Sequence, residues 1–345
     1  MHLALAALFW FGAVAESSKL QTKNFTTSNG LRYVYDYLPP AGENATVLLL
    51  HGFPSTRYDW RHQVAALSDA GYGILNPDLI GFGDSDKPLE IEAYSRKDHA
   101  DQLTELLDHE QLDVVVGAGH DWGAIVLSSM AVWHPERFSK LIYLSVGYTP
   151  PGIFVDFDAM NRQSLRQLGY MRYGYWYFFN SYDSGPLIKS HLESAFSLFF
   201  PVDNLAWGRT LSDLGVARDW LTANTTTPLA HYLTQEDKDA WMASFGQERG
   251  VDISLNMYKG IMRGVQAESE ESLTDADRMM HVPVLTISGA EDMIALAEEI
   301  PTITGPWVSG NYTAKTVQAG HWLFYEAAAE VNSIMLEFLG FDHKC

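Results

Sequence analysis

One segment constrains this chain more than any other, because it joins a buried strand to a helix through small residues and a single acid. Residues 114–124 read Val-Val-Val-Gly-Ala-Gly-His-Asp-Trp-Gly-Ala. Asp121 stands between Gly119 and Gly123, where the chain must turn sharply. A side chain at either glycine would collide with the neighbouring strand or helix as the turn tightens. The segment therefore predicts a strained turn that holds Asp121 at the carboxyl end of a sheet.

Two roles are open to Asp121. A carboxylate at a helix N-terminus meets the positive end of the helix dipole and free backbone N–H groups, which keep it ionised. It is then a nucleophile that needs no base to deprotonate it. The alternative is that Asp121 only caps the helix, which is a common use of aspartate. This segment alone favours neither role.

Apolar β-type runs alternate with amphipathic helical stretches elsewhere, which predicts a mostly parallel central sheet with helices on both faces. Residues 147–280 read instead as aromatic-rich helices. Because 345 residues can hold one large α/β domain with an insertion, we expect an α/β core from residues 16–146 and 281–345 and a helical cap (lid) from 147–280. The expected buried strands are residues 47–50, 73–75, 114–116, 141–146, 284–287 and 313–317, with an antiparallel edge hairpin that includes 31–37.

Further motifs favour the nucleophile role for Asp121. A loop with the sequence His-Gly-Phe-Pro, residues 51–54, directly follows an apolar strand. We expect the backbone N–H groups of Phe53 and Trp122 to converge on one oxygen and form an oxyanion hole. Both residues are also candidates for contact with the substrate.

An acid and a histidine follow the last two expected strands of the core. Asp292 ends one strand and His321 follows the next, which gives the chain order nucleophile, acid, histidine. In this arrangement the acid holds the imidazole in one tautomer and stabilises its charged form. Glu291 is the rival acid, but we favour Asp292 because its neighbour is expected to point away.

Four motifs in this order resemble the soluble-type epoxide hydrolases of the α/β-hydrolase fold. They are residues 51–54, residues 78–85 (Asp-Leu-Ile-Gly-Phe-Gly-Asp-Ser), residues 119–123 and residues 320–322 (Gly-His-Trp). The resemblance covers nearly the whole chain after about residue 20 and implies that Pro54 is cis. One departure is Ser55, where many relatives place an acidic residue.

The resemblance extends to two tyrosines in the cap. Residues 170–179 (Tyr-Met-Arg-Tyr-Gly-Tyr-Trp-Tyr-Phe-Phe) and 256–260 (Asn-Met-Tyr-Lys-Gly) are similar to the two segments that grip the epoxide oxygen in the family. Carried over residue by residue, they point to Tyr175 and Tyr258. Tyr173 or Tyr177 would replace Tyr175 if the register differs.

These residue types imply a two-step hydration of an epoxide. Asp121 attacks an epoxide carbon and forms an alkyl ester, while the two phenols donate to the oxygen as charge develops. His321, oriented by Asp292, then acts as general base for the water that cleaves the ester and releases a diol. The oxyanion hole stabilises the tetrahedral intermediate.

Two other functions compete with this one. A haloalkane dehalogenase shares the aspartate nucleophile, but it needs two N–H donors for the halide, and Phe53 stands where many such relatives place asparagine. A secreted hydrolase-fold protein that only binds its ligand would also explain the fold. That alternative, however, leaves Asp121, Asp292, His321 and the cap tyrosines as coincidence.

Composition limits the partners. A net charge of −20 repels phosphate backbones, so we expect no nucleic-acid partner. The Gly-Phe-Gly turn at residues 81–83 lacks the third glycine of a dinucleotide fingerprint, and the only cysteine is Cys345, so we expect no cofactor and no metal. The aromatic cap favours a small hydrophobic epoxide. We expect no firm membrane association, and the sequence indicates no oligomeric state.

The first residues favour export from the cytoplasm. Residues 3–14 form an apolar run of signal-peptide length that ends in Ala13-Val14-Ala15, which fits a cleavage site before Glu16. An uncleaved membrane tether or a cytoplasmic protein are the alternatives, because no Lys or Arg precedes the run. Sequons for N-glycosylation support a secreted protein and lie at Asn24, Asn44, Asn224 and Asn311.

Overall fold

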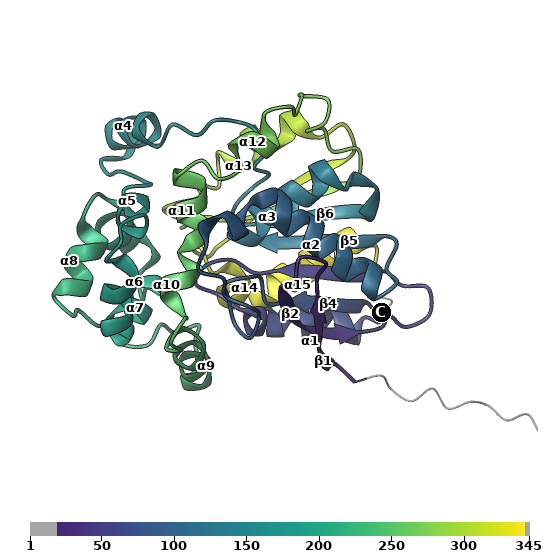
Figure 1. Cartoon of the computed structure of the whole chain (residues 1–345), viewed down its shortest axis with the longest axis horizontal. Helices are drawn as coiled ribbons and strands as arrows, with labels where there is room; N and C mark the ends of the chain where they lie inside the picture. The colour runs from purple at the N-terminus through teal and green to yellow at the C-terminus, as the bar shows by residue number, and fades with distance from the viewer. Residues whose placement is uncertain (1–18, 342–345) are drawn as a thin grey trace, which may run out of the picture.

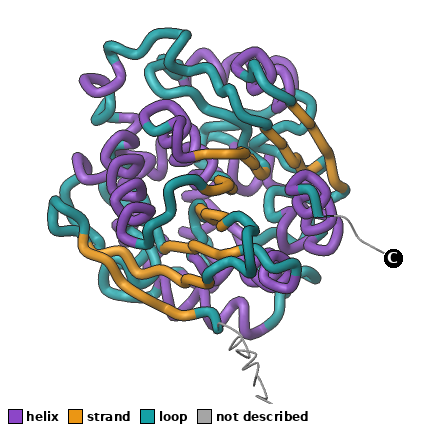
Figure 2. The backbone as a smooth tube through the Cα atoms, turned by 90° about the vertical axis from the view of Figure 1, so that its right-hand side faces the viewer, coloured by secondary structure: helices purple, strands orange, loops and turns teal. Residues whose placement is uncertain are grey.

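The computed structural model of the chain describes residues 19–341, and an eight-stranded sheet forms its centre (Figures 1 and 2). The expected signal segment, residues 1–15, and residues 16–18 of the expected core lie outside that range. The strands are β1 (Gln21–Thr26), β2 (Arg32–Leu38), β3 (Thr46–Leu50), β4 (Gly73–Pro77), β5 (Val115–His120), β6 (Phe138–Leu144), β7 (Val284–Gly289) and β8 (Tyr312–Val317).

The order of the strands is β1-β2-β4-β3-β5-β6-β7-β8. β2 runs antiparallel to β1 and to β4, whereas all other neighbours are parallel. The expected fold class, strands and edge hairpin are therefore confirmed. Three details were wrong: Val114 precedes β5 and is 51% exposed, β6 ends at Leu144 rather than at Val146, and Val317 is the one buried residue of β8.

Helices flank both faces of the sheet (Figure 2). Among the longer ones, α1 (Arg61–Asp69) packs beside α15 (Ala328–Leu339), and α2 (Arg96–His109) packs beside α3 (Trp122–Trp133). Almost every residue of α3 is buried, so this helix is fixed from all sides. The shorter core helices are η1 (Arg57–Trp60), η2 (Ile91–Tyr94), η3 (Pro135–Arg137), α13 (Ile300–Thr304), η6 (Gly305–Trp307) and α14 (Leu323–Glu326).

The helices between β6 and β7 gather at one end of the sheet and form the cap (Figure 1). Most of them have eight residues or fewer, and one is a π-helix, a form that is often found at functional sites. The cap helices are α4 (Phe157–Leu168), α5 (Tyr175–Phe179), α6 (Ser184–Ser190), α7 (Leu192–Phe199), η4 (Asn204–Ala206), η5 (Gly208–Ser212), α8 (Val216–Thr222), α9 (Gln235–Phe245), α10 (Val251–Ser254), α11 (Asn256–Met262) and α12 (Ala267–Glu270).

A buried ion pair fastens both ends of the cap to the core. Arg96 on α2 binds Glu270 through two hydrogen bonds of 2.8 and 2.6 Å. Gly152, near the start of the cap, donates its N–H to the same carboxylate at 2.7 Å. Since both carboxylate oxygens of Glu270 accept hydrogen bonds from Arg96, the pair can be buried without leaving an uncompensated charge. The entry and exit of the cap therefore meet at one point of the core.

Candidate active site

Asp121 occupies the turn between β5 and α3, and its backbone is strained. Its φ of 53° is unusual for a residue with a side chain. A Cβ at Gly119 would clash with the carbonyl of Gly123, and one at Gly123 would clash with the carbonyl of Leu50, so both glycines are required as expected. The Asp121 side chain makes no capping hydrogen bond to α3. The helix-cap role is therefore wrong, and the carboxylate is free to act elsewhere.

The surroundings of Asp121 keep its carboxylate ionised. The Phe53 N–H donates to Oδ1 at 2.8 Å, and Nε2 of His321 lies 3.6 Å from Oδ2. Burial alone would raise the pKa of Asp121, but the hydrogen bond and charge of His321, with help from the Phe53 N–H, lower it below its ordinary value. Of the two expected oxyanion donors, Phe53 contacts the carboxylate. The Trp122 N–H opens α3 beside it, and its role stays a prediction.

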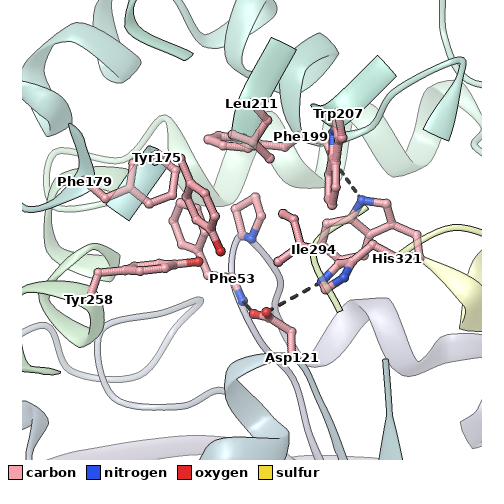
Figure 3. Close-up of a pocket in the computed structure, with 12 residues that line it drawn as sticks. Phe53, Asp121, Tyr175, Phe179, Phe199, Trp207, Leu211, Tyr258, Ile294 and His321 are labelled. Atoms are coloured by element: carbon pink, nitrogen blue, oxygen red, sulfur yellow. Dashed lines mark hydrogen bonds and ion pairs between the residues drawn. The ribbon is translucent and has the colours of Figure 1, made fainter. Parts of the chain in front are cut away.

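His321 lies between two carboxylates, as Figure 3 shows for its contact with Asp121. Its Nδ1 donates to Oδ2 of Asp292 at 2.7 Å. The other oxygen of Asp292 accepts the N–H groups of Ile294 and Ala295 at 2.8 and 3.0 Å, so this buried acid is fully hydrogen-bonded. Glu291 contacts Gln318 and Asn204 instead. The structure therefore brings Asp292, and not its neighbour, to the imidazole.

The imidazole of His321 is cationic at neutral pH in this arrangement. Burial alone would lower its pKa, but the charges of Asp292 and Asp121 and the hydrogen bonds to both raise it to about 10. This cation stabilises the ionised form of Asp121. It also means that His321 cannot accept a proton until the charge of Asp121 disappears.

His120 adjoins Asp121 in the sequence and packs against the ring of His321. Its ring does not point into the pocket, but it packs 4.9 Å from the His321 ring, and its Nε2 contacts the His321 carbonyl at 2.9 Å. Burial and the charge of His321 lower the pKa of His120 to about 3, so this ring is neutral. It therefore supports the backbone of His321 without competing for a proton.

A narrow pocket faces Asp121 beneath the cap, and Tyr175 and Tyr258 both line it (Figure 3). Their hydroxyls point from the cap side toward the carboxylate. Their rings meet edge to face with centroids 6.1 Å apart. Burial raises the pKa of both phenols well above its ordinary value, and the charge of Asp121 adds to the rise. Both groups are therefore neutral hydrogen-bond donors opposite an anionic oxygen.

The neighbouring tyrosines are engaged outside the pocket. The Tyr173 hydroxyl accepts a hydrogen bond from Arg172 at 2.6 Å, and the Tyr177 hydroxyl binds Asp158 near the surface. Neither residue lines the pocket, whereas Tyr175 does. The first tyrosine of α5 is thus the one that faces Asp121.

Carbon atoms make up most of the remaining pocket wall. Phe53 belongs to it, but Trp122, expected to contact the substrate as well, lies behind Tyr258 with ring centroids 4.8 Å apart. The sequence did not indicate several other members of the wall, which are Pro54, Phe179, Phe199, Trp207, Leu211, Ile294 and Trp322.

Two of these unexpected residues lie at the π-turn η5. Trp207 precedes it and packs 5.3 Å from the His321 ring, while its Nε1 donates to the Leu198 carbonyl at 2.8 Å. Leu211 lies within it. The extra residue in a π-turn rotates the positions that face inward, so the helical period of the sequence could not have identified this pair.

Between residues 19 and 341, no group of three or more His, Cys, Asp or Glu side chains is arranged to hold a metal ion. No helix in that part of the chain is long and apolar enough to span a bilayer.

The sequence of this chain is similar to those of known proteins. Residues 45–328 match the model of the family described as alpha/beta hydrolase fold. Epoxide hydrolase A of Mycobacterium tuberculosis is 30% identical over 333 residues, which cover 92% of this chain and 97% of that protein. Bifunctional epoxide hydrolase 2 of Rattus norvegicus is 26% identical over 306 residues; the match covers 86% of this chain but only 52% of that relative.

The fold of this chain is also similar to solved structures of epoxide hydrolases. An epoxide hydrolase from an endophytic Streptomyces aligns with a TM-score of 0.74 at 25% identity, covering 93% of this chain and 95% of that chain. Epoxide hydrolase A from Mycobacterium thermoresistibile aligns with a TM-score of 0.70 at 27% identity, covering 93% and 98%. The chain therefore belongs to the α/β-hydrolase fold family and, within it, to the soluble-type epoxide hydrolases.

Proposed function

We propose that this chain converts a small, apolar, uncharged epoxide and water to a vicinal diol through an alkyl ester on Asp121. One observation carries the proposal. An ionised carboxylate that caps no helix faces two neutral phenols across one narrow pocket. Attack on one side of the epoxide and donation to its oxygen on the other need this arrangement.

The first step forms the ester. An oxygen of Asp121 attacks an epoxide carbon, the carbon–oxygen bond of the ring breaks, and Tyr175 or Tyr258 gives its proton to the departing oxygen. Esterification removes the negative charge of Asp121, which is one of the two charges that keep His321 protonated. The pKa of His321 therefore falls, and its proton returns to the phenolate through solvent.

The second step hydrolyses the ester. Neutral His321, held by Asp292, takes a proton from water while the hydroxide adds to the ester carbonyl. The Phe53 N–H, which contacts Oδ1 of Asp121 in this structure, supports the resulting oxyanion. On collapse, His321 returns the proton to the leaving alcohol oxygen. The new carboxyl group then ionises, its proton recharges His321, and the net reaction consumes one water.

Loss of either phenol should slow ring opening. We expect Tyr258→Phe and Tyr175→Phe each to lower kcat/KM for styrene oxide by about 100-fold, because each removes one donor to the developing alkoxide. Tyr177→Phe is the matched control, since the Tyr177 hydroxyl contacts Asp158 outside the pocket. Equal losses in all three variants would count against the assignment of the two donors.

Two substrates separate this function from its rivals. We expect the purified protein to release phenylethanediol from styrene oxide and no chloride from 1-chlorobutane. The carbon-lined wall supports substrates without charge, because a buried ionic group would lack a partner there. Chloride release without diol would identify a dehalogenase, and ligand binding without either product would identify a binding protein.

We also propose that the protein enters the secretory pathway and is N-glycosylated. The exposure of the asparagine in all four sequons supports this proposal, since an exposed side chain leaves room for a glycan; these are Asn24, Asn44, Asn224 and Asn311. Protein from a eukaryotic host should begin at Glu16 and lose mass on enzymatic removal of N-glycans. A chain that begins at Met1 and shows no mass change would contradict both parts.

A further inference from the structure

The segment that bears the oxyanion donor, residues 52–61, comprises a loop, η1 and the first residue of α1, and the cap holds part of it. We refer to this segment as the oxyanion loop. At its start the Phe53 N–H contacts Asp121, but the Phe53 ring is buried among rings of the cap. Centroid distances of 5.4, 5.4, 6.4 and 5.4 Å separate it from Phe179, Phe199, Phe245 and Tyr258, respectively.

A tryptophan of the cap binds the backbone next to this donor. Nε1 of Trp241, on α9, donates to the carbonyl of Pro54 at 3.0 Å. The indole is 5% exposed and stacks on Phe245 with ring centroids 4.9 Å apart, so its position is fixed. The carbonyl that it holds belongs to the residue that follows the oxyanion donor.

The other end of α9 holds the same loop further along. Asp237 accepts hydrogen bonds from the Tyr58 hydroxyl at 3.0 Å and from Arg61 at 2.7 Å. Asp237 is itself fixed by a capping box with Thr234. One cap helix thus contacts the oxyanion loop near both of its ends.

The core holds mainly the later part of the loop. The Arg57 N–H donates to the buried Asp78 at 2.8 Å, and Tyr325 hydrogen-bonds Asp59. At the Phe53–Pro54 end, the ring packing and the bond to the Pro54 carbonyl come from the cap instead. The placement of the donor N–H therefore depends on the docked cap as well as on its own hydrogen bond to Asp121.

We infer that Trp241 is a positioning residue for the oxyanion hole, so that the hole is complete only while the cap is docked. This inference rests on the proposed ester mechanism. In ring opening the charge on Asp121 decreases, so a donor to its oxygen stabilises the start of the step more than its transition state. In ester hydrolysis the carbonyl oxygen becomes anionic, so the same donor stabilises the transition state. A displaced Phe53 N–H should therefore slow hydrolysis selectively.

Trp241→Phe tests this inference, because it keeps a ring and removes the indole N–H. Trp220→Phe is a matched control: Nε1 of Trp220 also donates to a cap carbonyl, that of Ser194, at 3.0 Å, but Trp220 contacts neither loop nor pocket. With styrene oxide, kcat of Trp241→Phe should fall about ten-fold or more, as expected for a weakened oxyanion donor. KM should fall in parallel, leaving kcat/KM within about two-fold, and intact-mass spectra should show accumulated ester.

The opposite kinetic pattern would overturn the inference. Unchanged kcat in a folded Trp241→Phe variant, or a loss of kcat/KM as large as the loss of kcat, would show that Trp241 does not act through the oxyanion. If Trp241→Phe does not fold, Asp237→Asn provides the second test, with a smaller shift in the same direction expected and no shift contradicting the inference. A wild-type protein that forms no ester and no diol would instead refute the proposed function itself.

Discussion

Replacing Asp121 with alanine is expected to abolish diol formation, with a loss of at least about four orders of magnitude in kcat/KM. The pocket contains no second carboxylate among its described lining residues, because Asp292 lies behind His321 and is hydrogen-bonded on both oxygens. No other group there can form the ester. Diol release from styrene oxide, followed by chromatography, measures the effect.

A second substitution controls for folding in this experiment. Asp121 has a positive φ that asparagine tolerates better than alanine does. Asp121→Asn should therefore keep the native circular dichroism spectrum and still show no rapid turnover. Diol formation within about ten-fold of wild type in either variant would show that another residue is the nucleophile.

Replacing His321 with glutamine is expected to stop the reaction half-way. Ring opening needs the ionised Asp121 and the two phenols, whereas ester hydrolysis needs a base, so the variant should consume one equivalent of epoxide and retain it. We expect steady-state turnover to fall by about 100-fold to 10,000-fold, which is the usual contribution of a general base. Intact-mass spectra should show the protein plus one substrate.

The double variant Asp121→Asn/His321→Gln identifies the bonded residue. It should show no adduct, because the attacking carboxylate is gone. An adduct that persists in the double variant would move the ester to another side chain. A single variant without any adduct, yet with slow diol release, would argue against a two-step reaction.

The turn around Asp121 could be predicted because its determinants are consecutive in the sequence. Gly119 and Gly123 are required by contacts with immediate neighbours, and the acid sits between them. The pairing of His321 with Asp292 rather than Glu291 followed from alternation after a strand, and the geometry agrees. Local sequence patterns were therefore sufficient to predict the catalytic residues that the core contributes.

Most of the contacts that the cap makes at the site could not be predicted from the sequence. Trp207 and Leu211 reach the pocket from a π-turn, and Trp241 reaches the oxyanion loop from a helix whose apolar pattern is weak. Each of these contacts depends on how short helices pack together, which no local period encodes. The contact between Nε2 of His120 and the carbonyl of His321 likewise joins residues far apart in the sequence, so only the folded structure shows it.

The cap is inserted between β6 and β7, so Asp121 is synthesised long before His321. Leu144 pairs with Ile287 across the entire cap, a non-local contact that forms late compared with local structure. Until then the nascent chain has neither the base that hydrolyses the ester nor the closed pocket that presents an epoxide to Asp121. The connectivity thus delays assembly of the pocket until β7 and the segment that carries His321 have been synthesised.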